Sequence, residues 1–128
     1  MSVLVDTSIW IEYFRDGNNF KKLDFLIDEN LVVTNDLILA ELIPFLKIKN
    51  QRKLINLLYK INKLEIVVNW EQIIDYQYKC LIKDLNGIGI PDLIIVQNAK
   101  QNHCSIYSLD NHFNLMENIL KIKLEGVP

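Results

Sequence analysis

The stretch that decides the fold is VLVDTSIWI, residues 3–11. Its first three residues are apolar and mostly β-branched, which is typical of a short buried strand. Asp6 ends this run, and Ile9 and Trp10 then begin a pattern with helical spacing. We therefore expect a strand over residues 3–5, a turn that carries a carboxylate, and a helix from Ser8 to about Arg15.

The same alternation of strand and helix continues along the chain. Further β-branched runs lie at residues 31–34, 64–68 and 105–107, with a weak one at 122–124. Helical patterns cover residues 20–28, 51–62, 70–85 and 91–102, and others begin at Asn35 or Asp36 and after Asp110. Pro44 falls inside the third helical pattern and predicts a kink or break there. The alternation predicts a parallel sheet with helices on both faces.

Composition indicates one ordinary globular domain over residues 1–128. Half of the residues are hydrophobic and 23% are charged, and no apolar run approaches the ~18 residues that a membrane span needs. The first residues show no basic region or small-residue cleavage site, so we expect no signal peptide and a cytoplasmic location. Cys80 and Cys104 are far apart in the sequence, which favours buried free thiols over a disulfide framework or a zinc site.

Four acidic residues stand where a parallel sheet binds ligands, beyond the carboxyl ends of its strands. Asp6 follows the first strand, and Asp110 follows the strand at residues 105–107 after two residues. Asp92 lies in the first turn of a helix, and Glu41 lies among apolar neighbours on the face shared with Leu37 and Ile38. We expect that face to turn towards the core or a cleft.

Each acid also has a structural explanation. Asp6 and Asp110 suit helix N-caps, and Asp92 suits the positive end of a helix dipole. Glu41 is harder to explain in this way, because an unpaired carboxylate is costly to bury. Taken together, four converging carboxylates repel one another and require a cation. Oxygen ligands favour Mg²⁺ or Mn²⁺. The net charge of −2 does not by itself attract nucleic acid, but divalent cations bound in an acidic pocket would attract a phosphodiester.

Four motifs that contain these acids resemble those of PIN-domain nucleases. The motifs are VDTSIWI at residues 5–11, LAEL at 39–42, PDLIIVQNA at 91–99 and SLDNHF at 108–113. Their order and gaps agree with the family pattern, and the resemblance spans residues 3 to about 124. The short chain, with nothing appended, is similar to VapC-type toxins of bacterial and archaeal toxin–antitoxin pairs.

The resemblance implies a three-layer α/β/α sandwich with a mostly parallel central sheet of about five strands. It implies that Asp6, Glu41, Asp92 and Asp110 coordinate Mg²⁺ or Mn²⁺ and are the catalytic residues. Thr7, Ser8 and Ser108 are expected to support them, although Ser8 is equally explained as a helix cap. The chain departs from the pattern at Pro44, at His112, where many relatives have an acid, and at residues 96–98, where smaller residues are common.

The implied activity is metal-dependent hydrolysis of RNA by a toxin. In this hypothesis an ion held by Asp6 and Asp92, with help from Glu41 or Asp110, lowers the pKa of a water that attacks the phosphodiester. The expected partners are RNA, a cognate antitoxin and a second copy of the chain in a homodimer. Apolar residues that exceed a simple core pattern suggest a protein-binding surface: Ile9, Ile11, Phe14, Leu46, Ile48 and Tyr59.

Basic residues form two candidate RNA-binding groups. The denser group follows the Glu41 helix, and the second lies near the first two helices; each residue is also explained as part of an ordinary solvated face. The groups are Lys47, Lys49, Arg52 and Lys53, and Arg15, Lys21 and Lys22, with His112 as a further substrate contact.

Other functions remain open at this level. One is a PIN ribonuclease of RNA processing that is not a toxin, and another is a PIN fold kept only as an interaction module. A phosphatase with Asp6 as nucleophile would require a second Asp and a late lysine, which the motifs lack. Metal-free RNA cleavage would require a matched pair formed by His103 and His112, and DNA or flap cleavage usually requires additional DNA-gripping segments.

Overall fold

Four short parallel strands form the centre of the fold. The structure is a computed structural model that describes residues 1–16 and 20–126. The strands are β1 (Val3–Val5), β2 (Val32–Asn35), β3 (Asn62–Leu64) and β4 (Ser105–Tyr107). Their order in the sheet is β3-β2-β1-β4, and every pairing is parallel. The chain therefore runs from β1 to one side of the sheet and later returns to the other side.

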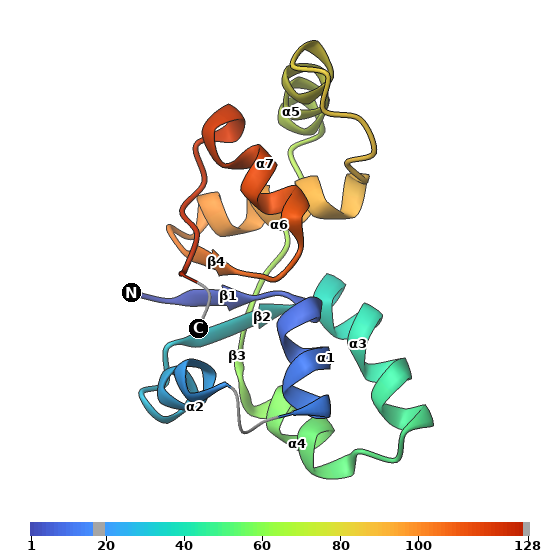
Figure 1. The fold of residues 1–128 in the computed structure, drawn as a ribbon, viewed down its shortest axis with the longest axis vertical. Helices are drawn as coiled ribbons and strands as arrows, with labels where there is room; N and C mark the ends of the chain where they lie inside the picture. Colours follow the sequence, from blue (N-terminus) through green and yellow to red (C-terminus); the bar gives the residue numbers. More distant parts are fainter. Residues whose placement is uncertain (17–19, 127–128) are drawn as a thin grey trace.

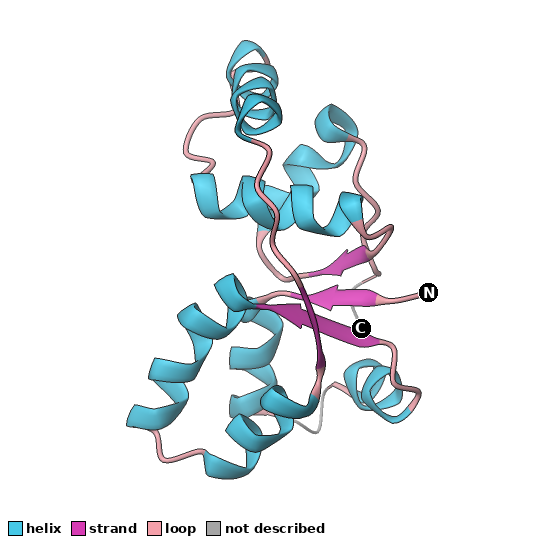
Figure 2. Ribbon diagram, turned by 180° about the vertical axis from the view of Figure 1, so that it is seen from behind, coloured by secondary structure: helices cyan, strands magenta, loops and turns pink. Residues whose placement is uncertain are grey.

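Helices lie on both sides of these strands (Figures 1 and 2). They are α1 (Thr7–Arg15), α2 (Lys21–Asp28), α3 (Asp36–Ile48), α4 (Arg52–Lys60), α5 (Trp70–Ile82), α6 (Ile90–Gln101) and α7 (Asn111–Leu120). Helices α1 to α4 group on one side, and α5 to α7 group on the other (Figure 1). This arrangement confirms the predicted α/β class with a parallel sheet between helical layers. Residues 17–19, which follow α1, lie outside the described part of the chain.

Local sequence explains why these elements form. The residues of β1 and β4 are all buried, and burial of each large aliphatic side chain contributes roughly 1.5–3 kcal/mol. Four of the helices begin at an Asp or Asn whose side chain accepts a hydrogen bond from the backbone of the first turn, a contact worth about 1 kcal/mol. These N-cap residues are Asp6, Asn35, Asn69 and Asp110.

The predicted strand over residues 64–68 was wrong in its bounds, because the strand is Asn62–Leu64 and residues 65–69 leave the sheet. Side-chain amides of α6 occupy the backbone groups that a neighbouring strand would otherwise bind. Asn98 Nδ2 donates to Glu65 O (3.0 Å), and Gln101 Nε2 donates to Val67 O (3.0 Å). Gln97 binds both backbone groups of Asn69. The segment is thus anchored to a helix rather than to the sheet.

Two further predictions change in detail. The weak fifth strand at residues 122–124 is a single parallel bridge between Ile106 and Leu124, so the sheet has four strands rather than about five. Pro44 does not break α3, which runs from Asp36 to Ile48 in one piece. Pro44 and Ala40, whose carbonyl loses its helical partner, are both exposed, so water can replace the missing hydrogen bond.

No helix in residues 1–16 and 20–126 combines the length and the apolar character that crossing a membrane requires.

A buried amide pair connects the two helical layers and yields the first testable prediction. Asn35 Nδ2 donates to Asn98 Oδ1 (2.8 Å), and both residues are fully buried. Asn98→Ala should lower the free energy of unfolding by about 1–3 kcal/mol, because it leaves a buried amide donor without an acceptor. Urea unfolding followed by circular dichroism measures this loss. Asn114→Ala, which removes an exposed amide, is the control and should change stability by less than about 0.5 kcal/mol; equal effects would contradict the prediction.

Candidate active site

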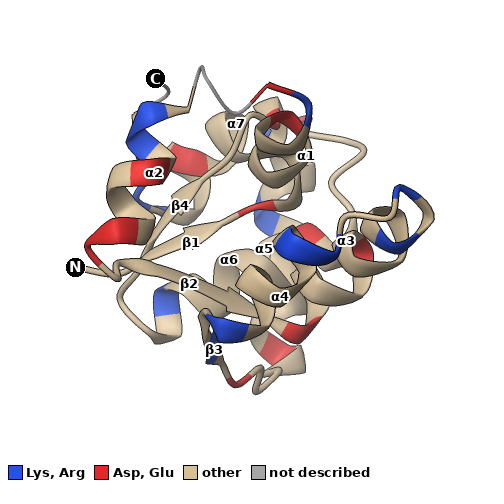
Figure 3. Ribbon diagram, turned by 90° about the horizontal axis from the view of Figure 1, so that it is seen from below, with Lys and Arg blue, Asp and Glu red and all other residues tan. Residues whose placement is uncertain are grey.

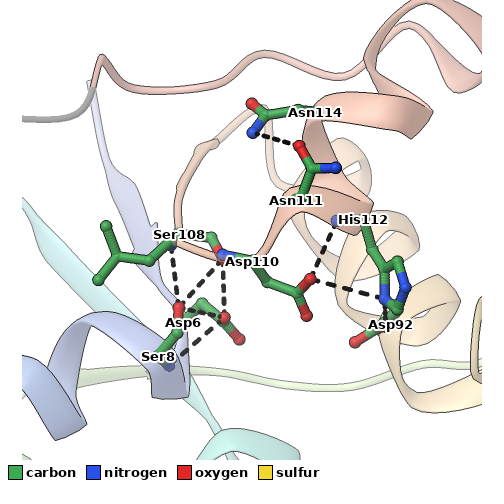
Figure 4. Close-up of polar contacts among 9 residues, drawn as sticks. Asp6, Ser8, Asp92, Ser108, Asp110, Asn111, His112 and Asn114 are labelled. Carbon is green, nitrogen blue, oxygen red and sulfur yellow. Dashed lines mark hydrogen bonds and ion pairs between the residues drawn. The ribbon is translucent and has the colours of Figure 1, made fainter.

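Asp6 lies at the carboxyl end of β1 and is almost fully buried, with 7% of its surface exposed. Its Oδ2 accepts hydrogen bonds from Ser8 Oγ (2.9 Å) and Ser108 Oγ (2.8 Å), and a longer one from Ser8 N (3.4 Å). Figure 4 shows the two serines converging on this carboxylate. Among the described residues no hydrogen bond reaches Oδ1, so this oxygen is available to a ligand.

Asp110 reaches the same edge of the sheet from β4. Val5 pairs with Tyr107 in the β1–β4 register, and Asp6 N donates to Tyr107 O (2.9 Å). The loop after β4 then crosses the end of β1, where Ser108 Oγ accepts from Asp110 N (2.9 Å). Asp110 is the N-cap of α7 and accepts from His112 N (2.9 Å). Its capping role and its place beside Asp6 are therefore compatible.

Asp92 enters the group from the first turn of α6. His112 Nδ1 lies 3.6 Å from Asp92 Oδ2 and 3.5 Å from Asp110 Oδ1, and the three side chains face one another (Figure 4). Burial raises the pKa of Asp92 above its usual value, and the negative charges of Asp110 and Asp6 raise it further. The nearby His112 opposes this rise. Asp92 is therefore close enough to Asp6 and Asp110, two other acids of the predicted quartet, for their charges to raise its pKa.

Glu41 approaches the group from α3. The face it shares with Leu37 and Ile38 turns partly into the core, because Ile38 is buried, whereas Glu41 itself is exposed. Partial burial still raises the pKa of Glu41, and the charges of Asp6 and Asp92 add to the rise. The Thr7 hydroxyl lowers this pKa, although Thr7 Oγ1 makes no standard hydrogen bond with the described residues. Glu41 therefore lies within electrostatic range of Asp6 and Asp92, with its carboxylate open to solvent.

No Lys or Arg forms an ion pair with any of these four acids in the part of the chain that the structure describes. The Lys and Arg ion pairs found there join Arg15 to Glu12, Lys22 to Glu125, Lys63 to Asp36 and Lys79 to Asp75. Within residues 1–16 and 20–126, His112 is the only basic side chain within 4.0 Å of a carboxylate oxygen of the group. Since close carboxylates repel one another, a bound cation would stabilise the arrangement.

The donor set fits a divalent cation. Asp92, Asp110 and His112 each offer one ligand atom, and these atoms all lie within 4.8 Å of one another. Asp6 Oδ1 and the exposed Glu41 carboxylate add oxygen donors at the same edge. Carboxylate oxygens are the ligands that Mg²⁺ and Mn²⁺ prefer, so the four acids fit such an ion.

The predicted basic groups are not part of this cluster. Lys47, Lys49, Arg52 and Lys53 are exposed at the α3–α4 turn, at the end of α3 far from the carboxyl end of β1 (Figure 1). A surface cavity there, lined by Lys47, Asn50, Gln51, Arg52, Ile55 and Asn56, has a volume of about 510 Å³. Arg15 pairs with Glu12, and Lys22 pairs with Glu125. Basic segments are spread over several elements, α2 and β3 among them (Figure 3).

The expected apolar surface is correct only in part. Ile9 and Leu46 belong to the core, with no exposed surface, whereas Ile48 and Tyr59 are exposed. A larger apolar surface on α5 was missed by the sequence analysis. Its exposed members are Trp70, Ile74, Tyr78, Leu81 and Ile82, with Ile90 at the start of α6. The repeat at residues 70, 74 and 78 marks one helical face, but the pattern alone does not distinguish an exposed apolar face from a buried one.

Buried amides that position α6 were not predicted from the sequence. Asn98 contacts Asn35, the N-cap of α3, and Gln97 binds Asn69 and Gln72. These contacts fix the helix whose first turn carries Asp92. Gln97 and Asn98 are the two amides within the otherwise apolar run of residues 93–99. They were visible in the sequence as part of the departure from the family pattern at residues 96–98.

Comparisons with known proteins agree with this architecture. The model of the PIN domain matches residues 3–118. The fold is similar to a chain in the crystal structure of VapBC2 from Rickettsia felis bound to a DNA fragment from its promoter, with a TM-score of 0.79, 20% identity and 100% of both chains covered. It is also similar to a chain of DNA-bound VapBC from Salmonella typhimurium, with a TM-score of 0.76, 15% identity and coverage of 98% of this chain and 97% of that one.

No curated protein matches the sequence. The PIN model nevertheless covers all four acidic motifs, from the strand that precedes Asp6 to the helix that follows Asp110. This chain belongs to the PIN domain family.

Proposed function

We propose that this PIN domain is a metal-dependent endoribonuclease and acts as the toxin of a type II toxin–antitoxin pair. The observation that carries the nuclease proposal is the convergence of Asp6, Glu41, Asp92 and Asp110 without a Lys or Arg partner among the described residues. A purely structural acidic cluster would be expected to have such a partner, because unpaired close carboxylates destabilise a fold.

The residues of the chain hold and orient the site. Ser8 and Ser108 hold the Asp6 carboxylate through Oδ2, and Oδ1 would bind the metal ion. Asp92 is held by the first turn of α6, and Asp110 is held by the cap of α7. A bound Mg²⁺ or Mn²⁺ supplies positive charge for a phosphodiester and lowers the pKa of an attacking water. No side-chain nucleophile is needed, so the four acids are the proposed catalytic residues.

The toxin proposal is supported by the fold and by the surface. The similar chains come from structures named VapBC, and this chain covers 100% and 97% of their lengths. Exposed apolar side chains on α5, together with Ile48 and Tyr59, are of the kind that mark protein interfaces. We propose an antitoxin and a second copy of the chain as the protein partners, and RNA as the substrate.

Asp6→Asn is the most direct test of the nuclease proposal. It should lower the rate of Mn²⁺-dependent RNA cleavage by about 10²–10³-fold or more, the size of effect seen when a key electrostatic contact is removed. The fold should persist because Asn caps a helix as well as Asp does. Cleavage of a fluorogenic RNA, with and without EDTA, measures the loss. Asp36→Asn, which alters an exposed acid paired with Lys63, is the matched control; full activity of Asp6→Asn would exclude the assignment.

Removing one acid should stabilise the metal-free protein near neutral pH. The pKa of Asp92 is raised in the folded state, so the folded protein gains stability when Asp92 is protonated and loses it as the pH rises through that pKa. In EDTA, Asp92→Asn should therefore melt at a higher temperature than the wild type. The gain should shrink as the pH falls towards the ordinary value of 3.8.

Added Mn²⁺ should reverse this order, since it raises the Tm of the wild type through binding but has little effect on Asp92→Asn. Thermal unfolding across a pH series checks both effects. Asp75→Asn removes a surface acid that pairs with Lys79 and should show neither effect. A lower Tm for metal-free Asp92→Asn at neutral pH would show that burial and the neighbouring acids do not destabilise the charged form of Asp92.

The basic α3–α4 turn is the proposed phosphate-binding surface. In an Asp6→Asn background, which prevents cleavage, Lys47→Gln with Arg52→Gln should weaken binding of single-stranded RNA. The slope of log affinity against log salt should fall by about 1.4 if each residue contacts one phosphate. A fluorescence anisotropy titration measures both quantities. Lys79→Gln on α5 serves as the control, and equal salt slopes for the two variants would show that this turn does not bind RNA.

A further inference from the structure

We propose that His112 is itself a ligand of the metal ion and that its imidazole gives the site a preference for Mn²⁺ over Mg²⁺. The inference rests on the proposed function, because the ion is the one that the four acids hold. It assigns His112 to the ion rather than to RNA.

The position of the His112 ring favours this role over a hydrogen-bonding one. Its Nδ1 lies 3.6 Å from Asp92 Oδ2 and 3.5 Å from Asp110 Oδ1, and both distances exceed those of ordinary hydrogen bonds. One ligand atom from each of Asp92, Asp110 and His112 nevertheless lies within 4.8 Å of the other two. A nitrogen that faces two carboxylate oxygens without forming a close hydrogen bond to either is suitably placed for an ion that all three atoms bind.

Packing holds these three groups in place before any ion binds. The backbone N–H of His112 donates to Asp110 Oδ1 (2.9 Å), which fixes the start of α7 against Asp110. The next residue, Phe113, is buried in the core and anchors the same turn. On α6, the buried Leu93 follows Asp92 and anchors that turn in the same way. The backbones of these two helix ends are therefore anchored on either side of the ligand atoms, which lowers the cost of ordering the site when an ion binds.

The chemistry of the donor set decides which ion is preferred. Mg²⁺ prefers oxygen ligands and near-ideal octahedral geometry, whereas first-row transition ions bind imidazole nitrogen readily. A neutral imidazole also contributes no negative charge, which weakens the attraction that a hard cation such as Mg²⁺ depends on. A site that combines Asp92 and Asp110 with His112 should therefore discriminate in favour of Mn²⁺.

The two histidines of the chain allow a spectroscopic test that does not depend on activity. Pulsed EPR of the Mn²⁺-loaded protein should show coupling to a directly bound ¹⁴N nucleus in the wild type. The coupling should disappear in His112→Ala and His112→Asp. His103→Asn is the matched control: His103 is exposed in a turn after α6 with φ 55°, a conformation that Asn tolerates, and this variant should keep the coupling.

Isothermal titration calorimetry measures the predicted selectivity. The ratio of Mn²⁺ to Mg²⁺ affinity should fall roughly tenfold in His112→Asp, comparable to the 10–100-fold losses seen when groups that support metal ligands are changed. His103→Asn should keep the wild-type ratio. His112→Asp should remain folded because an acid is favourable in the first turn of a helix, and circular dichroism checks this.

The outcomes separate the inference from the proposed function. Mn²⁺ binding without ¹⁴N coupling in the wild type would overturn the role of His112 and leave the four-acid site intact. Coupling that is lost in His103→Asn instead of His112→Ala would also overturn it, as would an unchanged Mn²⁺ to Mg²⁺ ratio in His112→Asp. Failure of the wild type to bind Mn²⁺ at all would overturn both the inference and the proposed metal-dependent function.

Discussion

The parallel pairing of β1 with β4 is the constraint on which the candidate site depends. It places Val5 opposite Tyr107 and brings Asp6 N within 2.9 Å of Tyr107 O. The chain leaves β1 towards β2 on one side and returns in β4 on the other, and parallel sheets bind ligands beyond the strand ends at such a change of direction. Ser108, 102 residues away from Asp6 in the sequence, donates to it at this edge of the sheet.

Electrostatic repulsion within the site is the cost of this arrangement. Burial and neighbouring acids raise the pKa values of both Asp92 and Glu41. The folded protein therefore destabilises the ionised form of these two carboxyl groups. Hydrogen bonds from two serines and two helix caps keep Asp6 and Asp110 in place despite the repulsion. The fold therefore maintains an anionic site that a divalent cation would stabilise, and its stability and its proposed function depend on the same groups.

Buried amides hold the second half of the site. Asn98 connects α6 to Asn35 at the end of β2 and to the backbone at Glu65, while Gln97 binds the residue that caps α5. Because a buried amide must find partners, these contacts define the position of α6 more narrowly than apolar packing alone would. They also explain why residues 65–69, although apolar and β-branched in part, lie against a helix instead of extending the sheet.

The sequence predicted the α/β class of the fold, the strands at residues 3–5 and 105–107, Asp6 and Asp110 as helix N-caps, and the four acids of the candidate site. These features depend on residues close together in the chain, whose spacing and propensities are visible in one dimension. Four features became visible only in the folded protein. Strand β3 ends at Leu64, and α3 continues through Pro44. Glu41 is exposed to solvent, and His112 lies close to both Asp92 and Asp110. Each of these depends on which distant groups exclude water or supply a hydrogen bond, and no local pattern encodes that.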